Sequence, residues 1–441
     1  MRAFTFKGLF LTAVFMLLGC LTIQAADDDL ITKQITIKLD KAGTLPDRIG
    51  SSRKYQITNL KLVGEINGTD FRMIREMAGS DYYGGSTEGN LSVLDLSEAK
   101  IVIGGGDCFN GYSCYTSNDV IGNRAFSGCS RLTSLTLPAS ITRIGDDAFC
   151  CCSGLTSLTL PAGITEIGYG AFWGCSGLTS LNLPAGITSI GDDAFYGCSG
   201  LTSITLPAGI TEIGGSAFNG CSRLTSLTLP AGITSIGGGA FYGCSGLTSL
   251  NLPAGITEIG GGAFGFCSGL TSINLPAGIT SIGEYAFYGC SGLTSVTLPA
   301  GITEIGECAF YGCSGLTSLT LPAGLTQIDD YAFSECSGLT SMYVYAEKVP
   351  KIGEDVFTGC DAKKCTVYVP KGTYADYRSS EFGYFENIVE FEATGIDKTT
   401  TSTDVKEVSR YSVNGQRLVG PTKGLNIVKY SDGSVKKVAV E

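Results

Sequence analysis

The hydrophobic pattern of residues 121–360 predicts short coils that each have two apolar sides. In one unit, Leu155, Leu158 and Leu160 alternate with Thr and Ser, which predicts a strand with one buried face. A proline follows directly and lacks an amide donor, so it predicts the end of the strand. A second apolar pair, Ile164 and Ile167, comes next at a spacing of three and precedes a glycine that permits a turn.

The unit repeats with a constant 23-residue period, as from Cys129 to Cys152. Ten cysteines keep this spacing from Cys129 to Cys336, Cys360 follows one residue late, and phenylalanines keep the same step from Phe126 to Phe333. A constant period with a Leu-x-x-Leu-x-Leu core is the signature of a leucine-rich solenoid, in which each unit adds one strand to a parallel sheet. We therefore predict a right-handed leucine-rich repeat solenoid of the β or α+β class over residues 119–365.

The stretches that flank the array differ in pattern. The ends of a solenoid must be capped, because an open end exposes both the core and a strand edge. We predict an N-terminal cap over 27–118 that includes a first rung at Leu91–Leu96, and a C-terminal cap over 366–392. A polar linker, 393–406, then leads to a small β module at 407–441 that contains two hairpin-turn signals.

The start of the chain has the pattern of an export signal. A basic start, an apolar run and the small residues Ala25 and Ala26 predict a secretory signal peptide, residues 1–26. Leu17-Leu18-Gly19-Cys20 also resembles a lipoprotein box, in which Cys20 carries the lipid, and plain cleavage near Ala25 is the alternative. The expected location is therefore secreted or at the outer cell surface, with membrane contact only through such an N-terminal anchor.

Composition excludes several functions. The net charge is −11 without a long basic run, so nucleic acid is a poor partner. The chain has no histidine, which excludes Ser-His-Asp and Cys-His catalysis and any zinc site that needs His. We predict no enzyme, no cofactor and no metal site. The carboxylate pairs are interpreted as solvated turns rather than calcium or acid-base sites; they are Asp146-Asp147, Asp192-Asp193 and Asp329-Asp330.

The cysteines fall into two groups. Those in phase stack in a column, and a bond at every rung would distort the stack, so we expect buried free thiols that act as small hydrophobes. Cys108 with Cys114, and Cys360 with Cys365, are candidate disulfides that would clip the loops of the two caps. Neither pair has the Cys-x-x-Cys spacing of a zinc or redox motif.

Two surfaces are candidates for binding, and each has a structural alternative. The sheet face presents Thr and Ser from nearly every rung, a neutral carpet that can bind polymers or proteins or can simply solvate a strand. A second column, directly after each Phe, is rich in aromatic residues that can anchor a partner or cover the coil. The candidate residues are Asn182, Asn251, Asn274 and Tyr343 on the sheet face, and Trp173, Tyr196, Tyr242, Tyr288 and Tyr311 in the aromatic column.

A further column alternates between Glu and Ser from one unit to the next, with twice the period of the repeat. It includes Glu166, Ser189, Glu212, Ser235 and Glu258. Skipping a rung keeps glutamates apart and reduces their repulsion, whereas duplication of a two-repeat block explains the alternation equally well.

The repeat resembles that of the BspA-like, or treponemal-type, leucine-rich repeat family of bacterial surface proteins. The shared pattern is Cys-x-x-Leu-x-x-Leu-x-Leu-Pro-x-x-Ile-x-x-Ile-x-x-x-Ala-Phe, and it covers 121–360. The tail is similar to C-terminal modules of secreted proteins, some of which are sorting signals. The resemblance implies non-enzymatic adhesion to protein or glycan ligands on host matrix or other cells, and the alternative is a structural spacer at the cell surface.

Overall fold

The computed structural model describes residues 30–110 and 115–392, and within the tail the strands at 407–412, 417–418, 424–430 and 435–440. The predicted signal peptide with Cys20, the loop residue Cys114 and the predicted linker lie outside the described residues. The chain forms two compact units, which divide after Phe391.

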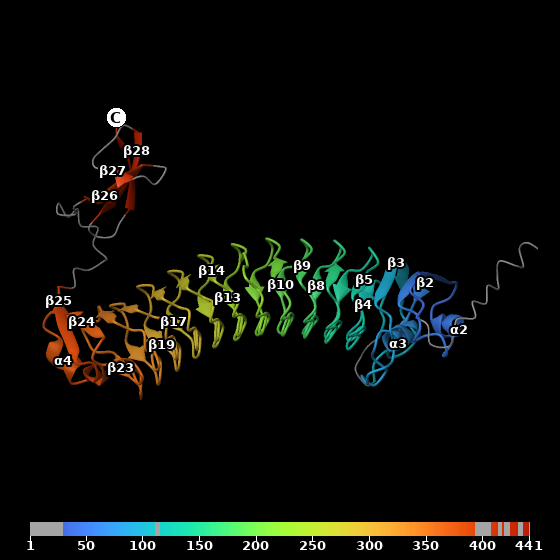
Figure 1. Ribbon diagram of the computed structural model, residues 1–441, viewed down its shortest axis with the longest axis horizontal. Coiled ribbons are helices and arrows are strands. Elements are labelled where there is room, and N and C mark those ends of the chain that lie inside the picture. The colour runs from blue at the N-terminus through green and yellow to red at the C-terminus, as the bar shows by residue number, and fades with distance from the viewer. Residues whose placement is uncertain are drawn as a thin grey trace, which may run out of the picture. The chain divides into compact units, whose positions relative to one another are not determined.

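The first unit is an elongated solenoid whose coils stack side by side along one axis (Figure 1). One side of the coils carries a parallel ladder in which neighbouring strands are related by one repeat, for example Ser134 opposite Ser157. The ladder is interrupted at residues 226–228, which leaves two seven-stranded sheets. The first sheet contains β1 (Ile35–Leu39), β2 (Asn59–Ile66), β3 (Val93–Ile101), β5 (Ser134–Thr136), β7 (Ser157–Thr159), β9 (Ser180–Asn182) and β11 (Ser203–Thr205). The second contains β14 (Ser249–Asn251), β16 (Ser272–Asn274), β18 (Ser295–Thr297), β20 (Ser318–Leu321), β22 (Ser341–Val344), β24 (Thr366–Pro370) and β25 (Asn387–Phe391).

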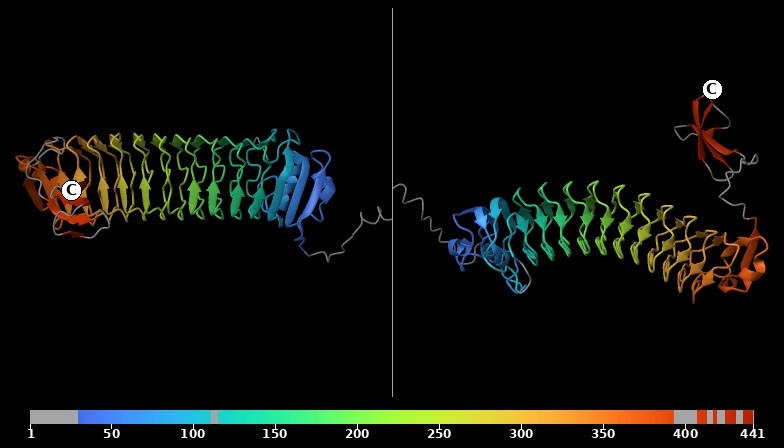
Figure 2. Two further views of the ribbon diagram at one scale, coloured as in Figure 1. Left: turned by 90° about the horizontal axis from the view of Figure 1, so that it is seen from above. Right: turned by 180° about the vertical axis from the view of Figure 1, so that it is seen from behind.

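A second ladder of two-residue strands lies on the opposite side of the coils, as Figure 2 shows from two directions. In each of these strands the isoleucine faces the core and its neighbour faces outward, which is the predicted second apolar pair. They form three short parallel sheets. The strands are β4 (Val120–Ile121), β6 (Arg143–Ile144) and β8 (Glu166–Ile167); β10 (Ser189–Ile190), β12 (Glu212–Ile213), β13 (Ser235–Ile236) and β15 (Glu258–Ile259); and β17 (Ser281–Ile282), β19 (Glu304–Ile305), β21 (Gln327–Ile328) and β23 (Lys351–Ile352).

The phenylalanines form a continuous stack in the core. From Phe126 to Phe333 successive rings are nearly parallel, with centroids 5.1 to 5.5 Å apart, and none of these side chains is exposed. The next step, to Phe357, contains one extra residue, and the ring spacing widens to 6.3 Å. A strictly constant period is therefore what keeps the rings in close contact.

The caps close both ends of this stack with rings that approach edge-on. Phe71 meets Phe126 at 5.4 Å with an interplanar angle of 69°, and Phe385 meets Phe357 at 5.0 Å with 61°. Edge-to-face contact suits the quadrupole of aromatic rings, so each cap covers the last apolar face without continuing the repeat.

The cysteine column links each coil to the one before it. Each Sγ from Cys152 onward donates a hydrogen bond of 3.0 to 3.3 Å to the main-chain oxygen of the Phe in the preceding coil. These thiols are buried and free, which confirms the prediction for the column. Their role exceeds that of a small hydrophobe, because each adds a second hydrogen bond to a Phe carbonyl oxygen that already accepts an amide of its own coil.

The predicted disulfide between Cys360 and Cys365 is wrong, since both are free thiols. Although Cys360 is one residue late, its Sγ still donates to the Phe333 oxygen at 3.3 Å and so belongs to the column. Cys365 is buried just before β24. At the other end Cys108 is disulfide-bonded, and Cys114, with which the sequence pairs it, lies outside the described residues.

The caps contain the helices of the first unit: α2 (Leu45–Ile49), α3 (Gly68–Met77), α4 (Tyr374–Arg378) and a 3₁₀ turn, η1 (Glu381–Tyr384). At the start of α3, Asn67 accepts a bond from the Thr69 amide and Asp70 accepts one from the Asn67 amide. The sheet begins two strands before the predicted first rung, because β1 pairs in parallel with β2, and β2 pairs in parallel with β3.

The second unit contains a four-stranded antiparallel sheet. Its strands are β26 (Glu407–Ser412), β27 (Arg417–Leu418), β28 (Gly424–Tyr430) and β29 (Val435–Val440), in the order β27-β26-β28-β29. Across the described parts of both units, helices are too short or too polar to cross a membrane.

Removing one ring from the middle of the stack should destabilise the solenoid. We expect Phe241→Ala to lower the free energy of unfolding by about 3–5 kcal/mol, as for other buried Phe side chains. Tyr242→Ala, the adjacent but exposed ring, is the matched control and should cost much less. Chemical denaturation followed by circular dichroism measures both, and equal losses would contradict a structural role for the stack.

The column thiols should resist alkylation while the chain is folded. Burial raises the pKa of Cys198 and of Cys244 to about 12, so almost no thiolate, the reactive form, exists there at pH 8. Iodoacetamide followed by mass spectrometry should modify the exposed Cys151 in the native protein and the column only after denaturation. Column labelling at equal rates in both states would overturn this.

Candidate binding surfaces

The threonine that begins each rung of the sheet has a structural role. Its hydroxyl donates to the main-chain oxygen of the equivalent residue in the previous coil, as Thr156 does to Thr133 at 3.1 Å and Thr202 to Thr179 at 3.0 Å. The same bond recurs along most of the array. This column therefore strengthens the ladder, and the Ser and third-position side chains remain as the outward groups of the carpet.

The three predicted asparagines do not form one cluster. All are exposed at the end of a strand, where Asn251 and Asn274 are register partners in neighbouring rungs. Asn182 faces Thr205 in the first sheet, on the other side of the interruption at 226–228. A shallow groove of about 450 Å³ lies over that interruption and is lined by Ser203–Leu206 and Ser226–Thr228, among others.

Tyr343 belongs to a different group, at the C-terminal end of the sheet face. Its ring stacks on Tyr368 with centroids 4.5 Å apart, and Phe391 meets both Tyr343 and Tyr345 edge-on. These side chains are half-buried against one another. The group therefore covers the last strands as well as offering an aromatic surface.

The predicted aromatic column forms two separate sets of contacts. Trp173 and Tyr196 pack together at 4.5 Å. Tyr288 and Tyr311 stack at 5.0 Å with their planes 7° apart. In the coil after Tyr242 the equivalent position is Gly265. A Cβ at this glycine would lie 2.7 Å from the Tyr242 ring, so the ring occupies the space of a side chain there.

Four exposed aromatic residues near this column were not among the sequence candidates. They are Tyr169, Phe266, Tyr285 and Tyr331. The last three lie at positions where the backbone has a positive φ, which favours glycine. The signal was present in the sequence, since aromatic residues occupy positions that are Gly, Asp or Ser in other coils, but the interpretation followed only the residue after each core Phe.

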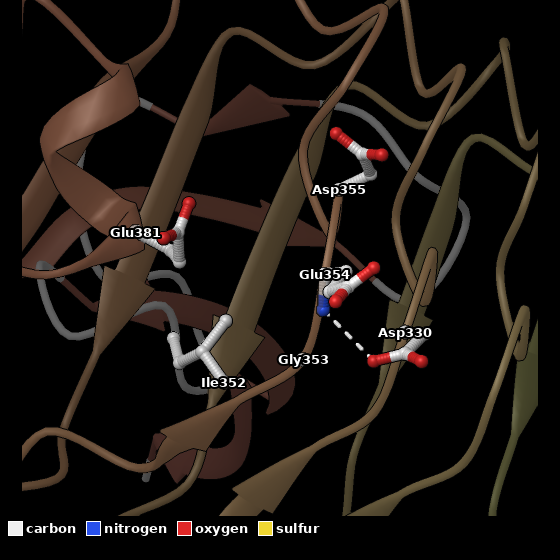
Figure 3. Close-up of a pocket in the computed structure, with 6 residues that line it drawn as sticks. All are labelled: Asp330, Ile352, Gly353, Glu354, Asp355 and Glu381. Carbon is white, nitrogen blue, oxygen red and sulfur yellow. Dashed lines mark hydrogen bonds between the residues drawn. The ribbon is translucent and has the colours of Figure 1, made fainter.

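An acidic depression of about 510 Å³ lies where the array meets the C-terminal cap (Figure 3). Asp330, Glu354, Asp355 and Glu381 line it, and the one bond between them joins the Glu354 amide to Asp330 Oδ1 at 2.8 Å. Their field reaches Tyr331, whose phenol pKa is raised mainly by Asp355. Within the part of the chain that the structure describes, three or more metal-ligating side chains do not converge on one point.

The paired aspartates act mostly on the next coil. Asp146 accepts the amide of Tyr169 at 3.1 Å, and Asp192 accepts that of Gly215 at 2.6 Å. Asp147 pairs with Arg124 at 3.0 Å. These contacts fix turns, as the solvated-turn interpretation requires, and also bind one coil to another.

The alternating glutamates are arranged as the spacing predicts. Ser235 lies between Glu212 and Glu258 in neighbouring strands, and Glu166 pairs with Arg143 at 3.0 Å. No two glutamates from this column are direct neighbours in the strands named here. Both explanations, electrostatic spacing and duplication, are consistent with this geometry.

The fold and these surfaces define a leucine-rich repeat protein, a class that generally binds proteins and is typically non-catalytic. The chain belongs to the BspA-type leucine-rich repeat family, whose model matches residues 108–221, 165–281 and 262–388. Among curated proteins none matches this chain.

Two crystal structures illustrate the likeness. A leucine-rich repeat protein from Bacteroides ovatus ATCC 8483 is 25% identical, with a TM-score of 0.52 over 81% of this chain and 92% of that chain. A leucine rich cell surface protein from Faecalibacterium prausnitzii A2-165 is 27% identical, with a TM-score of 0.43 over 72% of this chain and 85% of that chain.

Placing a glutamate between Glu212 and Glu258 separates the two explanations. If spacing reduces repulsion, Ser235→Glu should lower the midpoint of thermal unfolding at low salt, and about 1 M salt should restore most of the loss. Ser235→Gln, which has the same shape without the charge, is the control. A loss that does not depend on salt would mean that the alternation is a trace of duplication.

Proposed function

We propose that this chain is an exported, non-enzymatic surface protein that binds protein or glycan ligands on host matrix or other cells. The observation that carries the proposal is the long side of the solenoid, where the same outward groups recur from coil to coil. Because the core side chains are buried and the strands pair with one another, these outward groups are available to a partner. The export signal that the sequence predicts supports a location outside the cell.

A structural spacer is the second candidate. The ring spacing in the core stays between 5.1 and 5.5 Å along the regular array, so the coils are nearly equivalent. A uniform solenoid can hold a tail or a partner away from the cell surface, because a spacer of this kind does not need a specific binding site.

Binding assays distinguish the two. The chain without residues 1–26 is applied to immobilised matrix proteins, mucin and whole bacterial cells, with its heat-unfolded form as a control. The adhesion proposal expects saturable binding to at least one surface, and that binding should disappear on unfolding. Failure to bind any of them would favour the spacer.

A further inference from the structure

A continuous line of rings runs across four coils on the turn side of the array. Phe266 lies between Tyr242 and Tyr288, with centroid distances of 5.3 and 5.1 Å. Tyr288 continues to Tyr311 at 5.0 Å and contacts Tyr285 at 5.7 Å. We call these five residues the aromatic ridge. At about 4.8 Å per coil, three steps give the ridge a length of roughly 15 Å.

The ridge is not part of the core. The phenylalanine stack beneath it is complete in the same coils, through Phe241, Phe264, Phe287 and Phe310. On the ridge, by contrast, 44% of Phe266 and 39% of Tyr285 are exposed. A connected, exposed aromatic surface of this kind marks an interaction site more often than isolated apolar residues do.

Phe266 has a left-handed backbone conformation, which is unfavourable for a residue other than glycine. Eight of the eleven coils have Gly at the equivalent position, always with positive φ, and Phe266 adopts the same conformation at φ 54°. The left-handed conformation is unfavourable for a residue with a side chain, because the Cβ then approaches the following carbonyl oxygen. The glycine positions are Gly128, Gly174, Gly197, Gly220, Gly243, Gly289, Gly312 and Gly359.

The neighbouring coil accommodates this ring. A Cβ at Gly289 would lie 2.9 Å from Phe266 Cδ1, so the ring occupies the space above that glycine. In this coil the aromatic residue is Phe266, one position later than in its neighbours, because Gly265 occupies the usual position. The Phe266 ring therefore contacts both Tyr242 and Tyr288. Cys151 and Glu335 have the same left-handed backbone in this column, but Phe266 alone of the three places a ring between two neighbouring aromatic side chains.

The surroundings of the ridge are acidic. From position 224 to 347 the sequence contains eight Asp and Glu and no Lys, Arg or His. Glu284, Glu307, Asp330 and Glu354 come from consecutive coils, at the position before each left-handed residue. Four like charges in adjacent coils repel one another, unlike the spaced glutamates of the opposite ladder. Glu307 also accepts a bond of 2.9 Å from the Tyr285 hydroxyl.

We propose that the aromatic ridge binds an extended protein segment rich in lysine and arginine. Cationic side chains of such a segment lie over the ring faces and pair with the carboxylates beside them, which also relieves the repulsion within the acidic column. This inference rests on the proposed function, because it names the surface and the chemistry of one protein partner.

The test uses a fluorescent peptide of three tandem Gly-Lys-Gly-Arg units and the chain without residues 1–26. Phe266→Gly restores the glycine found in most coils, so the thermal midpoint should stay the same or rise. The affinity for the peptide, measured by fluorescence anisotropy, should fall about tenfold, as expected for loss of a central aromatic anchor. Unchanged affinity in Phe266→Gly overturns the proposal.

Charge is tested with two matched double variants. Glu284→Gln with Glu307→Gln removes two charges beside the ridge and should weaken binding at about 0.15 M salt. Glu258→Gln with Glu304→Gln removes two charges from the opposite ladder and should leave it nearly unchanged. Equal loss in both, or equal binding of a Gly-Glu-Gly-Asp peptide or a neutral oligosaccharide, means that the ridge is not a cation-binding surface.

The two proposals fail separately. If the unmodified chain binds matrix proteins or cells and Phe266→Gly binds them and the basic peptide equally well, adhesion stands and the ridge is wrong. If the basic peptide binds in a Phe266-dependent manner but no matrix or cell surface does, the ridge stands without the adhesion role.

Discussion

The structure depends on a single constraint, the stacking of equivalent atoms at one constant period from coil to coil. Each core Phe contacts its two neighbours, and its amide donates to the next coil, as from Phe195 to Ala217 at 2.8 Å. Its oxygen accepts the thiol of the cysteine in the next coil, as Phe195 does from Cys221. Ring contact, amide pairing and the thiol bond therefore all follow the same register. Where one residue is added, before Phe357, the thiol bond survives but the rings move apart to 6.3 Å.

This constraint separates the residues that build the array from those that are free to vary. Apolar side chains, mostly Leu, Ile, Phe, Ala and Cys, face inward in every coil, and the first Thr of each rung supports the ladder. Inward positions vary among apolar residues, as at Val296 and Met342, whereas outward positions vary in chemistry, and these changes differ in how much free energy they cost. A Tyr on an ordinary backbone costs little, whereas Phe266 requires a left-handed backbone and Glu284 to Glu354 require like charges in consecutive coils. The departures that cost free energy are the ones that point to a function.

Much of the architecture follows from the sequence because the period is so regular. The coil, the sheet ladder, the second apolar pair on the opposite side and the cysteine column were predictable from apolar spacing. The sequence did not show that Ile35–Leu39, Asn59–Ile66 and Asn387–Phe391 extend the same sheet, because these strands lack the Phe and Cys landmarks. The disulfide between Cys360 and Cys365 was a wrong inference, since sequence numbering placed Cys360 outside a column to which its Sγ still belongs. The sequence predicted Tyr242, Tyr288 and Tyr311 of the aromatic ridge but not Phe266, because Phe266 is one residue out of phase with the aromatic column.

Deleting one unit from the middle of the array tests most directly whether the solenoid depends on a constant register. Removal of residues 222–244, which is one full period, should leave a folded solenoid whose unfolding midpoint lies close to that of the parent chain. Removal of residues 222–243, which is one residue fewer, should lengthen the step from Phe218 to Phe264 to 24 residues, separate these two rings as Phe333 and Phe357 are separated, and lower the midpoint. Equal midpoints for the two deletions would show that the sheet alone holds the coils together and that the Phe and Cys register does not.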